Sequence, residues 1–144
     1  MGKNVVQPHE RIAPAANALS SGTSFKIQLF HSGQSIGWLG RVTGKDNYYY
    51  GVIVANETDA ISLSIYTWSD GNDYLKTSDD YYMTYSTNMD WVEFRGWGYA
   101  SAWVFESDGT LLNIKNNEHL SFYETGNTSL YTWDNYTILQ VQKG

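Results

Sequence analysis

Three short segments of the chain place carboxylates and amides next to aromatic rings or histidine. They read KDNYYYG from residue 45, SDDYYMT from residue 78 and NNEHLSF from residue 116. A flat ring can cover the apolar C–H face of a pyranose, while carboxylate and amide oxygens accept hydrogen bonds from sugar hydroxyls. The segments therefore predict sugar-binding chemistry. Their candidate side chains are Asp46, Asn47, Tyr49, Asp79, Asp80, Tyr82, Asn117, Glu118 and His119.

The same pattern has a purely structural interpretation. Asp and Asn are favoured in hairpin turns, and aromatic residues are favoured in the strands that flank such turns. Trp97, between Gly96 and Gly98, allows a similar choice. One interpretation makes its ring a stacking platform for a ligand, and the other folds the ring back to plug one end of a barrel.

Other chemistries find little support in the sequence. The chain has no cysteine, and its three histidines, at positions 9, 31 and 119, form no i, i+4 pair. Thiolate chemistry and a zinc site are therefore not predicted. No nucleophile elbow, phosphate loop or dinucleotide fingerprint occurs. We expect no cofactor, no metal and no enzymatic activity, with a glycosidase as a third hypothesis because carboxylate pairs such as Glu57 and Asp59 exist.

The charge of the chain restricts its partners. The formal net charge is −6, and the nine Lys and Arg residues form no cluster. Nucleic acids and anionic membrane surfaces both require a basic patch, so neither is an expected partner. No apolar run approaches the roughly 20 residues of a membrane-spanning helix, and no secretory signal is recognisable. We therefore predict no membrane insertion, and a protein that is cytoplasmic or released without a signal peptide.

The chain divides into an N-terminal segment and one domain. Residues 1–23 contain both prolines and a run rich in small residues, and they predict an arm or tail. Residues 24–144 follow as a single domain, in which short alternating runs end at Gly, Asn, Asp or Ser. These runs predict an all-β fold. The predicted strands are 25–30, 36–42, 47–55, 61–68, 73–78, 80–86, 90–95, 101–106, 110–115, 119–124, 128–133 and 136–142.

An internal period of 38 residues organises these strands. Gly33, Gly71 and Gly109 are equally spaced, each follows a strand-like run, and the last two end Ser-Asp-Gly corners. In such a corner, Asp accepts a hydrogen bond from the backbone two residues further on, and Gly takes the positive φ that the turn requires. Three copies of about four strands over residues 25–142 predict a β-trefoil, in which closure removes exposed sheet edges.

One repeat resembles a known family. The stretch from Trp103 to Leu111, WVFESDGTL, resembles the W-x-F-x-x-D-G-T-I motif of ricin-B-type β-trefoil lectins. The resemblance implies the trefoil architecture and a carbohydrate-binding role. It does not transfer the family's sugar-contacting Asp, because the matching positions here are Gly40, Lys76 and Asn113. No Gln stands at a Q-x-W position.

These observations predict a non-enzymatic lectin for neutral glycans or glycoproteins, for example defence-related ones. Its affinity would be strengthened by several sites on one molecule or by homo-oligomerisation. The alternative function is a protein-binding β-trefoil, such as a protease inhibitor or a toxin-complex component, since fold alone does not choose function. The alternative fold is an antiparallel β-sandwich, because TILQVQ at 137–142 looks like a fourth copy of the first strand.

Overall fold

The computed structural model describes residues 23–144, and the predicted N-terminal arm lies outside this range except for Thr23. The described chain is all-β, as predicted, with two short 3-10 turns, η2 (Glu57–Asp59) and η3 (Trp97–Tyr99). Every predicted strand overlaps an observed one. The strands are β1 (Ile27–His31), β2 (Gln34–Thr43), β3 (Tyr49–Val54), β4 (Leu63–Thr67), β5 (Asp73–Thr77), β6 (Tyr82–Tyr85), β7 (Val92–Arg95), β8 (Trp103–Phe105), β9 (Leu111–Asn113), β10 (Glu118–Phe122), β11 (Leu130–Thr132), β12 (Thr137–Ile138) and β13 (Gln140–Lys143).

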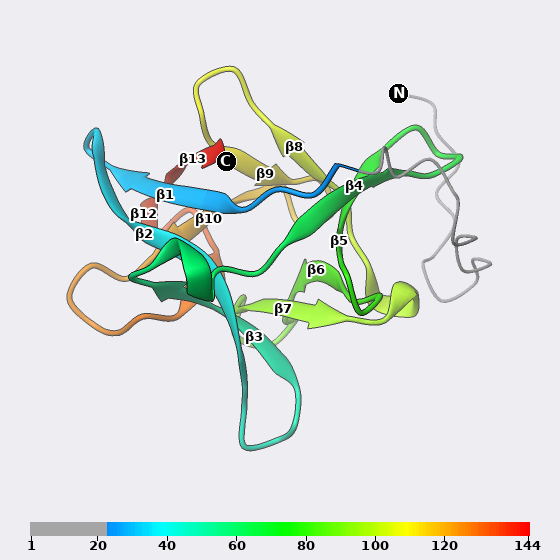
Figure 1. Ribbon diagram of the computed structural model, residues 1–144, viewed down its shortest axis with the longest axis horizontal. Coiled ribbons are helices and arrows are strands. Elements are labelled where there is room, and N and C mark those ends of the chain that lie inside the picture. Colours follow the sequence, from blue (N-terminus) through cyan, green and yellow to red (C-terminus); the bar gives the residue numbers. More distant parts are fainter. Residues whose placement is uncertain (1–22) are drawn as a thin grey trace.

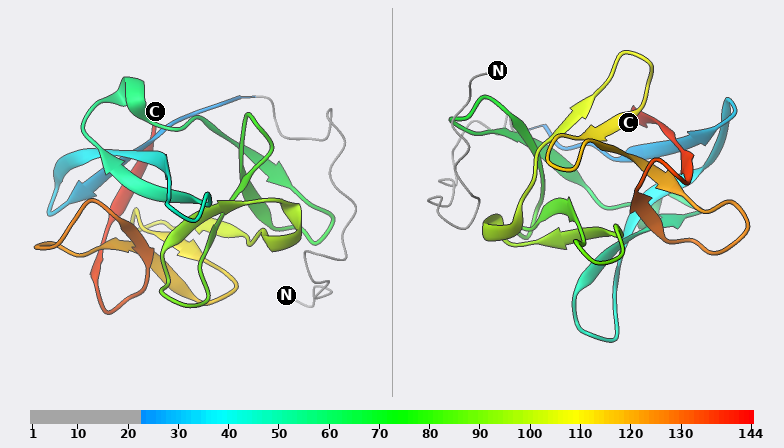
Figure 2. Two further views of the ribbon diagram at one scale, coloured as in Figure 1. Left: turned by 90° about the horizontal axis from the view of Figure 1, so that it is seen from below. Right: turned by 180° about the vertical axis from the view of Figure 1, so that it is seen from behind.

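The strands form two antiparallel groups (Figure 1). The larger follows the order β13-β1-β2-β3-β7-β6-β5-β4, and the smaller follows β11-β10-β9-β8 with β12 beside β10. The larger sheet curls, because Phe25, two residues before β1, pairs with Leu63 of β4. Single bridges from Val52 to Ser129 and from Trp91 to Tyr131 join the two groups, and both views of Figure 2 show them as curled layers around one interior. Curled antiparallel sheets of this kind are also consistent with an antiparallel β-sandwich, the alternative fold.

The core comes from the alternation of apolar residues along each strand. Ile27, Leu29 and Leu39 are buried in the larger sheet, and Leu111 and Leu120 are buried in the smaller group. Trp103, the tryptophan of the lectin-like motif, is almost fully buried, and its indole N–H donates to the carbonyl of Met83 at 2.9 Å. Burial of this ring and its hydrogen bond fixes β8 against β6.

The two Ser-Asp-Gly corners have the predicted turn. The amide of Asn72 donates to Asp70 Oδ1 at 2.9 Å, and that of Thr110 donates to Asp108 Oδ1 at 3.0 Å. Gly71 (φ 80°) and Gly109 (φ 91°) both adopt the left-handed conformation. Gly33 has φ 78°, but its corner is a tighter hairpin in which only Ser32 and Gly33 lie between the paired His31 and Gln34.

The segment 136–142 forms two strands instead of one. β12 pairs with β10, and β13 pairs with β1. The change of partner occurs at Leu139, which is fully buried and whose amide donates to the carbonyl of Leu120 at 3.0 Å. The last strand of the chain therefore lies beside the first described strand. Within residues 23–144, no helix has the length and apolar character needed to cross a membrane.

Candidate functional site: an aromatic cleft beside strand β7

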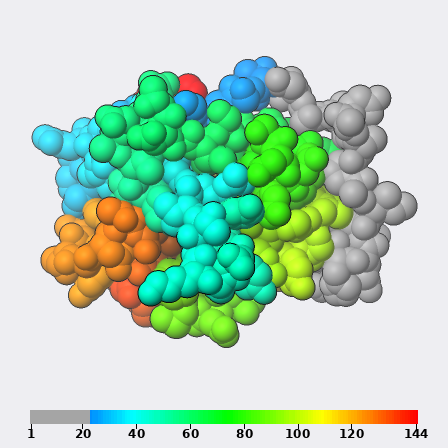
Figure 3. Space-filling view, turned by 60° about the horizontal axis from the view of Figure 1, so that its bottom comes forward, coloured from blue at the N-terminus to red at the C-terminus, as the bar shows by residue number. Residues whose placement is uncertain are grey.

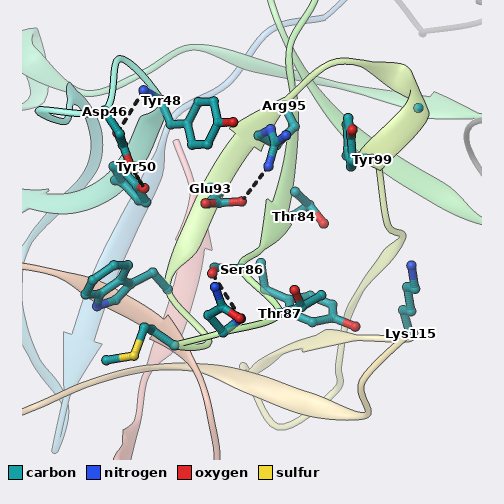
Figure 4. A pocket seen from close by; sticks show the side chains of 15 residues that line it. Asp46, Tyr48, Tyr50, Thr84, Ser86, Thr87, Glu93, Arg95, Tyr99 and Lys115 are labelled. Atoms are coloured by element: carbon teal, nitrogen blue, oxygen red, sulfur yellow. Dashed lines mark hydrogen bonds and ion pairs between the residues drawn. The ribbon is translucent and has the colours of Figure 1, made fainter.

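A cleft of about 590 Å³ opens where β7 meets the hairpin between β2 and β3 (Figure 4). Four parts of the chain contribute: this hairpin, the end of β6 with the β6–β7 turn, β7 with η3 and the preceding Trp91, and the β9–β10 turn. The lining residues are Asp46, Tyr48, Tyr50, Thr84, Tyr85, Ser86, Thr87, Asn88, Met89, Trp91, Glu93, Arg95, Gly98, Tyr99 and Lys115. Pairing of β3 with β7, with Tyr50 opposite Glu93, brings the first and third of these parts together.

The alternation of β7 decides which of its side chains reach the cleft. Val92 and Phe94 are fully buried in the core, whereas Glu93 and Arg95 line the cleft on the opposite face of the strand. The strand sequence VEFR thus supplies a carboxylate and a guanidinium to one surface.

Arg95 lies between two tyrosine rings. Its guanidinium carbon is 4.5 Å from the ring centroid of Tyr48 and 4.1 Å from that of Tyr99. Figure 4 shows the Arg95 side chain between these two residues. The guanidinium also donates to Glu93 Oε1 at 3.2 Å. Guanidinium groups are weakly hydrated and stack well on aromatic faces. Tyr99 remains 62% exposed, so the outer face of this stack is open to solvent.

Glu93 is a buried carboxylate at the base of this stack. Burial raises its pKa, and the hydrogen bond from Arg95 acts in the opposite direction. Desolvation disfavours the charged form of a carboxylate, so a partner that donates a hydrogen bond is expected at this position. Arg95 is that partner.

Asp46 is oriented by its own turn. Its Oδ2 accepts from the hydroxyl of Tyr50 at 2.5 Å, and its Oδ1 accepts from the amide of Tyr48 at 3.0 Å. The bond from Tyr50 lowers the pKa of Asp46, helped by the amide of Tyr48, and the same bond raises the pKa of Tyr50 to about 12. Asn47, with φ 68°, makes the tight turn that places these groups. Asp46 is therefore an ionised acceptor at neutral pH.

The charges of the cleft balance. Asp46 and Glu93 contribute two carboxylates, and Arg95 and Lys115 contribute two cations, so the formal charge of the lining is zero. Hydroxyl-bearing residues of the β6–β7 turn, Ser86 and Thr87, complete the polar side of the cleft. Such a cleft offers donors, acceptors and ring faces to a ligand without a net charge.

Other residues of the first two predicted segments lie outside the cleft. Tyr49 points away from Tyr48 and Tyr50. Its ring packs edge-on against that of Tyr81, with 4.9 Å between the ring centroids. Arg41 lies over its ring, with 4.4 Å from the guanidinium carbon to the centroid, and pairs with Asp79. This bond lowers the pKa of Asp79. Asp80 is exposed and forms an ion pair with Lys76 at 3.4 Å.

The third predicted segment forms a separate network. Asn117 adopts a left-handed turn conformation, and Glu118 accepts from the amide of Asp134 at 2.6 Å. His119 lies between Asp134, 3.0 Å from Nδ1, and Glu106, 2.8 Å from Nε2. These residues therefore join the turn after β11 to the β8–β9 turn and lie outside the cleft.

Trp97 and Tyr82 are buried, with 8% and 3% of their surfaces exposed. Their ring centroids are 5.0 Å apart, within a cluster that also contains Tyr66 and Tyr74. The ring of Trp97 is therefore folded back into the protein, and neither ring offers a face to a ligand here. Tyr82 differs from the outward Tyr48 because β6 turns its side chain toward this cluster.

Most of the cleft's aromatic and charged residues were not among the sequence candidates. Tyr48 and Tyr50 lie on either side of Tyr49, which was predicted as a sugar-binding residue. Glu93 and Arg95 lie in the aromatic-rich stretch before Trp97. A period-2 pattern does place Tyr48 with Tyr50 and Glu93 with Arg95 on shared faces. That these two faces meet depends on the pairing of β3 with β7, for which no local signal exists.

No protein-family model matches this chain, and no curated protein matches it in sequence. Among residues 23–144, no group of three or more His, Cys, Asp or Glu side chains is arranged to hold a metal ion.

Proposed function

We propose that this protein is a lectin that binds neutral glycans without turning them over, and that its fold is a β-trefoil of three repeats. The observation that carries the proposal is the cleft beside β7. It combines an exposed tyrosine ring, Tyr99, with an ionised acceptor, Asp46, in a lining of zero formal charge. Sugar recognition needs a ring for the C–H face and fixed acceptors for hydroxyls.

Three features support the trefoil. The glycines at 33, 71 and 109 share the left-handed conformation at a spacing of 38 residues. The corners at 70–72 and 108–110 contain the same hydrogen bond from an amide to Asp. β13 also lies beside β1, as a closed barrel requires of the last and first strands. Three related lobes would allow more than one glycan site per molecule, which increases avidity.

The cleft also supports a neutral ligand over a charged one. Arg95 already donates to Glu93, and Asp46 already accepts two hydrogen bonds. A sulfate or carboxylate group would have to compete with Glu93 for the guanidinium. The net charge of −6 on the whole chain adds a general repulsion of anions.

The test is binding of the labelled full-length protein to an array of neutral glycans, followed by calorimetric titration of the glycans that bind. Tyr99→Ala removes the exposed ring and is expected to weaken binding about fivefold, the equivalent of about 1 kcal/mol for a ring contact. Tyr99→Phe keeps the ring and is expected to retain most of the affinity. Tyr123→Ala is the matched control, since Tyr123 is 46% exposed and lies outside the cleft.

Three outcomes would contradict the lectin proposal. Silence across neutral glycans at micromolar protein excludes it. Inhibition of a protease without any response to sugars favours the protein-binding alternative. Turnover of a chromogenic glycoside favours the glycosidase hypothesis over a lectin that leaves its ligand unchanged.

A further inference from the structure

A second hollow adjoins the cleft. Its volume is about 370 Å³, and its lining is mainly apolar. Figure 3 shows this face, on which the β2–β3 hairpin (cyan to teal) lies between the orange β10–β11 segment and the yellow-green region of β7. The lining residues are Val42, Lys45, Asp46, Tyr50, Gly51, Val52, Trp91, Ser129 and Leu130.

The two hollows share a common wall. Asp46, Tyr50 and Trp91 line both of them. The rings of Tyr50 and Trp91 meet edge to face, with centroids 5.6 Å apart, and the Tyr50 hydroxyl is fixed by Asp46. Tyr50 lies in β3 and Trp91 immediately precedes β7, and these two strands are paired with Tyr50 opposite Glu93. The two rings therefore form an aromatic ridge between the two hollows.

The volumes set the size of the ligand. Small-molecule sites in proteins usually measure about 300–1,000 Å³, so each hollow alone has the capacity of such a site. A single sugar ring would leave much of the two hollows unfilled. A chain of rings can place one ring face on the ridge and its neighbours on either side.

The chemistry of the two hollows differs in the way a chain of sugar rings can use. The cleft offers Asp46, Arg95 and hydroxyl groups, which match a ring with several free hydroxyls. The second hollow offers Val42, Val52 and Leu130, which match the apolar face of a ring or a methyl-bearing substituent.

We propose, on the basis of the lectin function proposed above, that the cleft and the second hollow form one extended site for a neutral oligosaccharide. The ligand crosses the ridge of Tyr50 and Trp91 and occupies both hollows. A chain of about three or more units is required, and shorter saccharides use the cleft alone.

The experiment measures affinity against chain length. Malto-oligosaccharides, cello-oligosaccharides and N-acetylchito-oligosaccharides of one to six units are titrated calorimetrically into the full-length protein. In the series that binds, affinity is expected to rise at least about tenfold between the disaccharide and the tetrasaccharide, which corresponds to about 1.4 kcal/mol.

A matched pair of variants tests whether the increase in affinity with chain length comes from the second hollow. Val42→Arg places a long side chain in the second hollow, and Val104→Arg makes the same change on β8, away from both hollows. The two valines have similar exposure, 45% and 40%. The increase in affinity with oligosaccharide length is expected to disappear in Val42→Arg and to persist in Val104→Arg.

The outcomes separate this inference from the function on which it depends. Binding of mono- or disaccharides with no gain for longer chains overturns the extended site and leaves the lectin proposal standing. The same holds if Val42→Arg keeps the full gain or if Val104→Arg also loses it. Absence of binding by every series, together with silence of the neutral glycan array, overturns both.

Discussion

Tyr48, Tyr49 and Tyr50 are three consecutive residues with three different roles. Tyr48 stacks on Arg95, Tyr49 packs under Arg41, and Tyr50 donates a short hydrogen bond to Asp46. The alternation of the strand sends the middle ring to the other face. Tyr48 and Tyr50 therefore face the cleft, whereas Tyr49 between them packs on the opposite side of the hairpin.

His119 allows a prediction at the residue scale. Burial lowers its pKa, but hydrogen bonds with Asp134 and Glu106 outweigh this effect and raise the pKa above 6.5. The folded state then binds the proton more tightly than the unfolded chain does. The resulting stabilisation is complete below about pH 6.5 and is lost as the pH rises through the folded-state pKa.

We therefore expect His119→Gln to flatten the decline of the free energy of unfolding above pH 6.5. Urea denaturation at a series of pH values measures the slope, and an NMR titration of the imidazole protons of His119 measures its pKa directly. An unchanged slope in the variant, or a titration midpoint below 6.5, contradicts the predicted direction. The same slope in the wild type and in Tyr123→Ala serves as the control.

Turns give the prediction at the scale of elements. Gly33 has φ 78°, and a Cβ added there would meet no atom within 4 Å. The cost of Gly33→Ala is therefore purely conformational, about 1–2 kcal/mol in the free energy of unfolding. Gly96 is the matched control, because its φ is −64° and a Cβ there also meets nothing within 4 Å.

Gly96→Ala is expected to change the free energy of unfolding by less than about 1 kcal/mol, and in the stabilising direction, because alanine restricts the unfolded chain. Chemical denaturation of both variants gives the comparison. Equal effects of the two substitutions would show that the left-handed turn after β1 is not what Gly33 provides.

The elements also show what the sequence could predict. Strand positions and the Ser-Asp-Gly corners are determined locally, by alternation and by a carboxylate that bonds an amide two residues away, and they were predicted correctly. Of the residues that line the cleft, the sequence predicted only Asp46 as a site residue, and the predicted Asn47 makes the turn beside it. Its other half, Glu93 and Arg95, comes from a strand about 45 residues away, and burial of Trp97 depends on rings from three other strands. Local patterns carry no information on either.

At the scale of the whole molecule, the last strand connects otherwise separate parts. Lys26 and Gly144 exchange backbone hydrogen bonds of 3.0 and 2.8 Å, which continue the pairing of β13 with β1. Gln140 forms a bridge with Thr110, which immediately precedes β9 of the smaller group, and Leu139 is buried in the common core. The segment from Leu139 to Gly144 therefore joins the edge of the larger sheet to the smaller one.

Deletion of residues 139–144 should consequently destabilise the entire domain. It removes a fully buried leucine and leaves β1 with an unpaired edge, which predicts a loss of at least about 3 kcal/mol in the free energy of unfolding. A relocated chain, in which residues 139–144 precede Met1, restores the same strand through a different connection. Because the entropy of loop closure grows only slowly with length, this chain should recover most of the lost stability. Thermal unfolding followed by circular dichroism compares the three proteins. If the truncated chain melts like the full chain, or if relocation recovers nothing, the segment from Leu139 to Gly144 is not what holds the two groups of strands together.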